Sequence, residues 1–156
     1  MKMFLLGIVV LVLSCNGQKK ASMVEDKEDN STQSDSLVLL VRDSYSGSDL
    51  SETLIITNSK ALKFFFSQVN KTRKPGIQVP EVDFSKEVVI IHCSGKQGSA
   101  ALPMLTLLKE TDTTLVLGSR FEINKKTNSA TVVTSPFCVY KMPLTTKRIS
   151  VEKGLE

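Results

Sequence analysis

The sequence contains few of the residues on which catalytic and metal sites depend. It has one histidine and three cysteines in 156 residues, and no two cysteines form a Cys-x-x-Cys pair. A Ser-His-Asp or Cys-His catalytic scheme must therefore use His92, and a histidine metal site must complete its ligands with carboxylates or thiolates. The missing Cys-x-x-Cys pair argues against dithiol redox catalysis.

The sequence also lacks an apolar run long enough to cross a membrane. The run from Met3 to Leu13 would rise about 16 Å as a helix, whereas the hydrocarbon core of a bilayer measures about 30 Å. Lys2 precedes this run and the small residue Ser14 follows it, which is typical of a signal peptide. We expect residues 1–14 to be removed.

Residues 11–15, Leu-Val-Leu-Ser-Cys, resemble a bacterial lipobox, in which the cysteine thiol receives a diacylglycerol and cleavage makes it the new N-terminus. The aliphatic Val12 lies three positions before Cys15, and the small Ser14 lies directly before it. We predict that Cys15 carries a lipid anchor of the palmitate type, since two or three acyl chains at about 0.8 kcal/mol per methylene hold a protein permanently. The alternative is an ordinary secretory signal with a chance cysteine.

Residues 16–35 mix charges of both signs and contain almost nothing that could form a core. We predict a disordered tether with a reach of about 25 Å between the lipid on Cys15 and the rest of the chain. Asn16 follows Cys15 in place of the aspartate that resembles an inner-membrane retention signal of enteric bacteria. This favours the outer membrane, on either its periplasmic or its surface face.

The net charge of the mature chain is small. Removal of Lys2 leaves 19 of the 20 Lys and Arg residues against 16 Asp and Glu residues, a net charge of +3. This charge is too mild for a nucleic-acid-binding protein, and the lysines are dispersed. We therefore expect no nucleic acid as a partner; the lipid on Cys15 implies the membrane as one.

Residues 36–156 are enough for a single globular domain and too few for two. One amphipathic helix is expected after a cap at Asn58 or Ser59. Its apolar residues recur at spacings of three and four: Ala61, Leu62, Phe65, Phe66 and Val69. This periodicity places one face of the helix against a core.

The remainder of the domain is expected to be β-structure. Apolar and alternating segments predict strands at 36–42, 54–57, 88–93, 102–109, 115–123, 131–133, 137–140 and 148–152. We expect the first and third of these strands to be buried on both faces, the fourth and fifth to form a hairpin, and the last to be an edge strand. The predicted fold class is α+β, a mainly antiparallel sheet, as a sandwich or roll, with one principal helix.

Three features of this domain bear on chemistry. His92 is flanked by Ile91 and Cys93, which favours a sheet residue near a strand end over a catalytic base. Cys93 and Cys138 remain once Cys15 is acylated, and an even number of thiols in an oxidising compartment permits a disulfide. The alternative is that both are buried thiols.

The loop Ser94, Gly95, Lys96, Gln97 and Gly98 is the most distinctive in the sequence. Its small residues let the backbone approach another surface closely, so we predict a partner-contact loop, with an ordinary flexible turn as the alternative. It is not a phosphate loop, because Gln97 follows Gly-Lys where Ser or Thr is required.

Residues 80–90, Pro-Glu-Val-Asp-Phe-Ser-Lys-Glu-Val-Val-Ile, resemble the C-terminal domain of the protease-complex subunit PrcB family. The likeness continues with Gly95 and Gly98 and with the proline-led segment 135–143, and it covers residues 54–152. The loop departs from the family, whose members often carry a Thr-Gly-Gly-Tyr-like stretch there. The resemblance implies an accessory lipoprotein of the Bacteroidetes type that assembles with or stabilises a surface protease. Phe84 would then enter the core, and Asp83 would accept hydrogen bonds from turn amides.

Together these features predict a non-enzymatic, lipid-anchored envelope protein that acts as a protein-binding or accessory module without a cofactor or metal. The first alternative is a small envelope hydrolase that uses Ser94, His92 and an unlocated acid. The second is a purely structural envelope lipoprotein. Composition and motifs leave the partner and the oligomeric state open.

Overall fold

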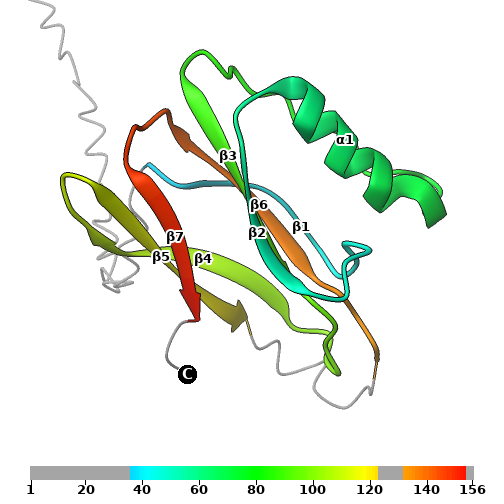
Figure 1. Ribbon diagram of the computed structural model, residues 1–156. Coiled ribbons are helices and arrows are strands. Elements are labelled where there is room, and N and C mark those ends of the chain that lie inside the picture. Colours follow the sequence, from blue (N-terminus) through cyan, green and yellow to red (C-terminus); the bar gives the residue numbers. More distant parts are fainter. Residues whose placement is uncertain (1–35, 123–131, 154–156) are drawn as a thin grey trace, which may run out of the picture. The chain divides into compact units, whose positions relative to one another are not determined.

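The computed structural model describes residues 36–122 and 132–153, all within one unit of the chain, residues 32–156 (Figure 1). The predicted signal peptide, Cys15 and the tether lie outside the described residues. The elements are β1 (Val38–Asp43), β2 (Ser51–Ile56), α1 (Ser59–Val69), the short 3-10 helix η1 (Asn70–Thr72), β3 (Glu87–Ser94), β4 (Leu102–Glu110), β5 (Thr114–Glu122), β6 (Phe137–Pro143) and β7 (Arg148–Lys153).

The described strands form two sheets. The first has the order β1-β6-β3-β2 and is antiparallel throughout. The second has the order β4-β5-β7, in which β4 and β5 form the predicted hairpin and β7 pairs with β5 in parallel. The predicted α+β class with mainly antiparallel strands is confirmed, and the two sheets make it a sandwich rather than a roll.

The four-stranded sheet is covered on both faces. On one face, Val89, Ile91 and Phe137 pack against Leu62 and Phe66 of α1. On the other face, a second apolar cluster joins the sheet to the β4-β5-β7 sheet; it contains Val88, Ile90, Leu105, Leu117 and Tyr140, among others. The domain therefore has three layers: helix, four-stranded sheet and three-stranded sheet (Figure 1).

Helix α1 begins where the sequence predicts. The Asn58 side chain accepts a hydrogen bond from the backbone N–H of Ala61 at 2.9 Å, which satisfies one of the free amides of the first turn. The buried residues of the helix are Leu62, Phe65, Phe66 and Val69. All four belong to the predicted apolar face.

Strand β3 is the central element of the domain. Every residue from Val88 to Ser94 is buried, because α1 covers one face of the strand and the second sheet covers the other. The expectation for β1 was wrong: it is an edge strand that pairs only with β6, and Val38 and Leu39 are exposed. A short aliphatic run alone does not distinguish a central strand from an edge strand.

The predicted strand at 131–133 is also not found. Residue 131 lies outside the described residues, and Val132 and Val133 are exposed and outside any strand. The chain instead makes single bridges just afterwards, from Thr134 to Gln97 and from Ser135 to Tyr45. Apolar, β-branched residues favour a strand only where the backbone of the segment can pair with a neighbouring strand.

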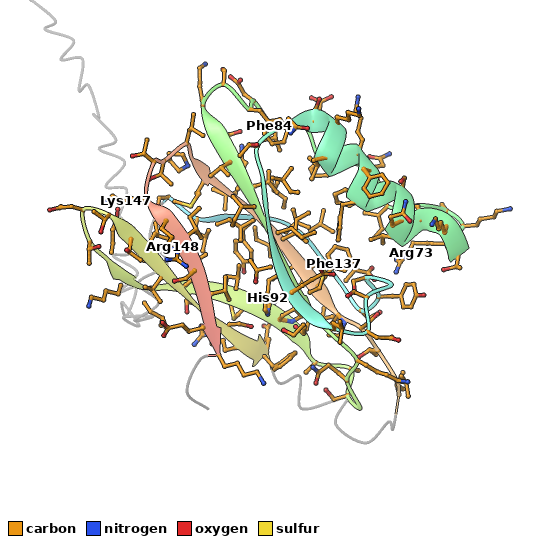
Figure 2. All side chains as sticks on the ribbon, viewed as in Figure 1. Arg73, Phe84, His92, Phe137, Lys147 and Arg148 are labelled. Atoms are coloured by element: carbon orange, nitrogen blue, oxygen red, sulfur yellow. The ribbon has the colours of Figure 1, made fainter. Side chains whose placement is uncertain are left out.

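The turn before β3 agrees with the expectation for Asp83 and Phe84. The Asp83 carboxylate accepts hydrogen bonds from the backbone N–H and the hydroxyl of Ser85, at 3.1 and 2.6 Å, and these lower its pKa. Phe84 is half-buried and packs against the core beneath α1 (Figure 2). Both residues have structural roles at the point where the chain enters β3.

Candidate functional site

His92 lies between the two sheets, two residues before the end of β3 (Figure 2). Side chains alternate along a strand, so His92 points to the same side as Val88 and Ile90, towards the three-stranded sheet. It is 8% exposed. The predicted position of His92, in a sheet near a strand end, is thus the position that the structure shows.

Both ring nitrogens of His92 are hydrogen-bonded to hydroxyl groups. Nδ1 lies 3.0 Å from Oγ1 of Thr53 on β2, and Nε2 lies 3.0 Å from Oγ of Ser119 on β5. A neutral imidazole has one N–H donor and one acceptor nitrogen, so one hydroxyl accepts and the other donates. We call this arrangement the hydroxyl bridge: Thr53, His92 and Ser119 connect β2 through β3 to the second sheet.

The surroundings of His92 favour the neutral ring. Burial lowers its pKa below the ordinary value of 6.5, since the charged form would lose its hydration. Because hydroxyl groups occupy both nitrogens, no carboxylate is hydrogen-bonded to the ring. A catalytic imidazole normally has such a carboxylate to orient it and to stabilise the imidazolium.

The structure does not bring Ser94 to His92. Ser94 lies at the end of β3, and its buried Oγ makes no hydrogen bond with any described residue. The hydroxyl group that contacts Nε2 is that of Ser119. The hydrogen-bonded pair of Ser94 and His92 on which the hydrolase alternative depends is therefore absent from the described part of the chain.

The predicted contact loop is bound to the domain on two sides. Gly95 has a φ of +73°, and a Cβ there would lie 2.8 Å from the backbone nitrogen of Ser51, so only glycine fits. The backbone N–H of Lys96 donates to the carbonyl of Asp49, and Gln97 exchanges two backbone hydrogen bonds with Thr134. The close approach that small residues predicted is therefore made to the protein's own backbone.

The outward part of this loop is small. Lys96 and Gly98 are exposed, whereas Ser94 and Gly95 are buried. Within the described residues the loop serves mainly to hold the segment after residue 131 and the segment before β2. A role in partner contact stays a prediction for its exposed residues.

Cys93 and Cys138 are free and buried. Cys93 belongs to the core beneath α1, and Cys138 belongs to the core between the sheets, so the two side chains lie on opposite faces of the four-stranded sheet. The disulfide that the cysteine count permits is not formed, and the alternative of two buried thiols describes the structure. Burial raises the pKa of Cys93 to about 11 and that of Cys138 to about 12.

The described residues provide neither a cluster of metal ligands nor a helix that could span a membrane. No group of three or more His, Cys, Asp or Glu side chains there is placed to hold a metal ion. None of the helices in the described ranges has the length and apolar character needed to cross a bilayer.

The edges of the sheets differ in how they are protected. A free edge presents unpaired backbone groups to other chains, and proteins usually guard it with bulges, charges or proline. Bulges interrupt β1 and β4, and Pro103 lies within β4. β7 carries Arg148, Glu152 and Lys153. These three edges are guarded in the ordinary ways.

The edge of β2 has neither a bulge nor a proline, and its single charge, on Glu52, leaves the rest of the strand unguarded. Its six residues pair with β3 without interruption, from Ser51 with Ser94 to Ile56 with Val89. The strand has no proline and one charged residue, Glu52. Ser51, Glu52, Thr53 and Ile55 are exposed. β2 is therefore a regular and unguarded strand edge, and we take it as the candidate site (Figure 1).

The hydroxyl bridge holds this edge from behind. Thr53 lies opposite His92 in the register of β2 and β3, and its hydroxyl is the part of β2 that reaches His92. The sequence predictions did not include Thr53 or Ser119. Ser119 alternates with Leu115 and Leu117, so its inward position was predictable, but its meeting with His92 depends on how the sheets pack.

Comparisons of the chain with protein-family models, curated proteins and solved structures found no match.

The lowered pKa of His92 predicts a pH dependence of stability. The unfolded chain protonates His92 below pH 6.5 more readily than the folded chain does, so stability is present above that pH and is lost as the pH falls towards the folded pKa. The slope of unfolding free energy for one proton is at most about 1.4 kcal/mol per pH unit. Urea unfolding from pH 7.5 to 5 should show this loss, and His92→Gln should remove it.

His92 is the only histidine, which makes this test specific. A second loss of stability at lower pH should persist in His92→Gln, because hydrogen bonds from Ser85 and Lys141 lower the pKa values of Asp83 and Glu87. An unchanged slope between pH 7.5 and 5 in His92→Gln would contradict the assignment.

The buried thiols predict slow reaction with thiol reagents. At pH 8 the thiolate of Cys93 is about a thousandth of the total or less, because its pKa is about 11. We expect negligible labelling of the folded protein and two reactive thiols after unfolding without reductant, with Cys15 blocked by its lipid. Thiols that appear only after reduction would show a disulfide instead, and a third thiol would show an unmodified Cys15.

Proposed function

We propose that this chain is a lipid-anchored protein of the cell envelope, held at the outer membrane by acylated Cys15, and that it binds another protein through the edge of β2 without catalysing a reaction.

 The single observation that carries the proposal is the exposed, regular and unguarded backbone edge of that strand. The lipid anchor places this edge in the envelope, at the outer membrane.

The chemistry of the β2 edge defines the partner. An extended peptide segment can add to a free edge as a new strand, where backbone hydrogen bonds supply affinity and alternate side chains supply specificity. On one face of β2 such a strand would meet Thr53 and Ile55, and on the other it would meet Glu52 and Leu54. The partner we propose is thus an extended segment with an apolar residue near Ile55 and a basic residue near Glu52.

The hydroxyl bridge supports the proposal because it reduces the cost of binding. Thr53 is tied to His92 and, through the ring, to Ser119 in the second sheet. A strand that is held in its bound conformation loses less conformational freedom when a partner adds to it. We infer that the bridge has a positioning role for the edge.

The resemblance of residues 80–90 and 135–143 to the PrcB family supports a more specific form of the proposal. In this form the chain is an accessory subunit that assembles with or stabilises an envelope protease, and the added strand comes from that protease. A lipid anchor on Cys15 and a binding edge on the domain are the two parts that such a subunit needs.

The hydrolase alternative receives less support from the chemistry of His92. The only serine hydroxyl on the ring is that of Ser119, and the other nitrogen faces the neutral hydroxyl of Thr53. A neutral hydroxyl does not stabilise the imidazolium that forms when a serine is activated, as a carboxylate does. We therefore propose a binding function in place of a hydrolytic one.

A single charge at the edge tests the proposal. Ile55 is 41% exposed, and Ile55→Lys places on β2 the kind of residue with which proteins block strand addition. We expect about tenfold weaker binding, equivalent to about 1.4 kcal/mol, measured as partner recovery after crosslinking in native membranes. The matched control is Val38→Lys on the bulged edge of β1, where Val38 is 45% exposed.

The control should recover the partner as the unmodified chain does. Equal recovery by Ile55→Lys and the unmodified chain would contradict binding at β2. If deletion of the gene weakens the membrane without changing the activity of any extracellular protease, the result would support the alternative of a purely structural envelope lipoprotein.

A further inference from the structure

The outward face of α1 combines an exposed aromatic ring with lysines. The buried residues of the helix face the four-stranded sheet, so the opposite side of the helix carries Lys60, Lys63, Phe64 and Ser67, and Lys71 follows in η1. We call these five residues the α1 outer face. Phe64 is 66% exposed, the largest value among the aromatic residues of the described part.

The charged residues of the segment that contains α1 and η1 have one sign. No acidic residue occurs between Glu52 and Glu81, whereas five basic residues do: Lys60, Lys63, Lys71, Arg73 and Lys74. Arg73 forms an ion pair with Asp43, which neutralises it. The four lysines make no ion pair with any described residue. Their charges are available to a partner.

We propose that the α1 outer face rests on an anionic lipid surface, as a second contact with the membrane besides the lipid on Cys15. An aromatic ring between lysines suits the boundary between headgroups and acyl chains, where the ring enters the apolar region and each lysine adds about 1 kcal/mol of attraction. The inference rests on the lipid attachment that we propose for Cys15. Without that attachment, the one ring and three lysines of the α1 outer face bind a membrane only weakly.

The layers of the domain make this contact compatible with binding at β2. α1 lies on one face of the four-stranded sheet, and the β4-β5-β7 sheet lies on the other (Figure 1). The β2 edge lies at the side of the four-stranded sheet rather than on either face. A domain that rests on α1 therefore leaves the β2 edge free for a partner.

The absence of tryptophan from the chain allows a direct test. Phe64→Trp introduces a single indole at the centre of the α1 outer face. The full-length acylated protein carrying Phe64→Trp is reconstituted into vesicles of phosphatidylcholine, with or without phosphatidylglycerol. We expect a blue shift of the indole emission, and quenching by brominated acyl chains, in the vesicles that contain phosphatidylglycerol.

The matched control places the indole on the opposite side of the domain. Leu108 is 55% exposed and lies over Gly118 on the outer face of the three-stranded sheet. Leu108→Trp should show neither the shift nor the quenching.

In the Phe64→Trp protein, Lys60→Glu and Lys63→Glu should each reduce the fraction of protein whose indole contacts lipid, since each lysine removed changes partition into the vesicles by roughly fivefold. Salt at 1 M should release the α1 outer face from the vesicle surface, because it screens interactions between charges more than about 3 Å apart.

Flotation of the same vesicles separates this inference from the anchor. Protein that floats with the vesicles while its indole at position 64 stays unshifted would overturn the α1 contact and leave the anchor intact. Protein that does not float would overturn both. If the indole emission shifts in whole envelopes but not in anionic vesicles, the α1 outer face binds an acidic protein. That result would overturn the assignment to lipid.

Discussion

The burial of β3 on both faces is the constraint on which the rest of the domain depends. Val89, Ile91 and Cys93 require a cover on one side, which α1 supplies, and Val88 and Ile90 require a cover on the other, which the second sheet supplies. Each buried side chain of this size contributes about 1.5 to 3 kcal/mol relative to exposure. The three layers follow from this one strand, and so does the position of β2, which pairs with β3 and has no other strand beside it in the described part of the sheet.

His92 is the point where this apolar arrangement admits polar groups. A buried imidazole requires partners for both nitrogens, and Thr53 and Ser119 supply them from an edge strand and from the second sheet. A second polar contact, between Arg42 of β1 and Glu122 of β5, also joins the two sheets. The end of the sandwich at which β2 begins is therefore fixed by directional contacts, and a buried hydrogen bond from the backbone N–H of Leu105 to the hydroxyl of Tyr140 adds another between the sheets.

Local patterns predicted most of the elements but not the site. The spacing of Leu62, Phe65, Phe66 and Val69 defines α1, and the β-branched run of β3 defines a central strand, because both signals depend on neighbours in the chain. The edge position of β1 and the insertion of β6 between β1 and β3 depend on contacts between distant segments. For the same reason the sequence indicates that Ser119 points inwards but not that it meets His92, and it does not reveal β2 as the unguarded edge.

The most direct test of this account is amide hydrogen exchange along β2. Ser119→Ala removes one end of the hydroxyl bridge and leaves the pairing of β2 with β3 in place, so the account predicts faster exchange of the β2 amides that bond to β3. A lost hydrogen bond of about 1 kcal/mol corresponds to roughly fivefold faster exchange. The amides of β6 should be unchanged, and so should β2 in the control Ser150→Ala. Exchange along β2 that does not respond to Ser119→Ala would contradict the claim that the bridge holds this edge.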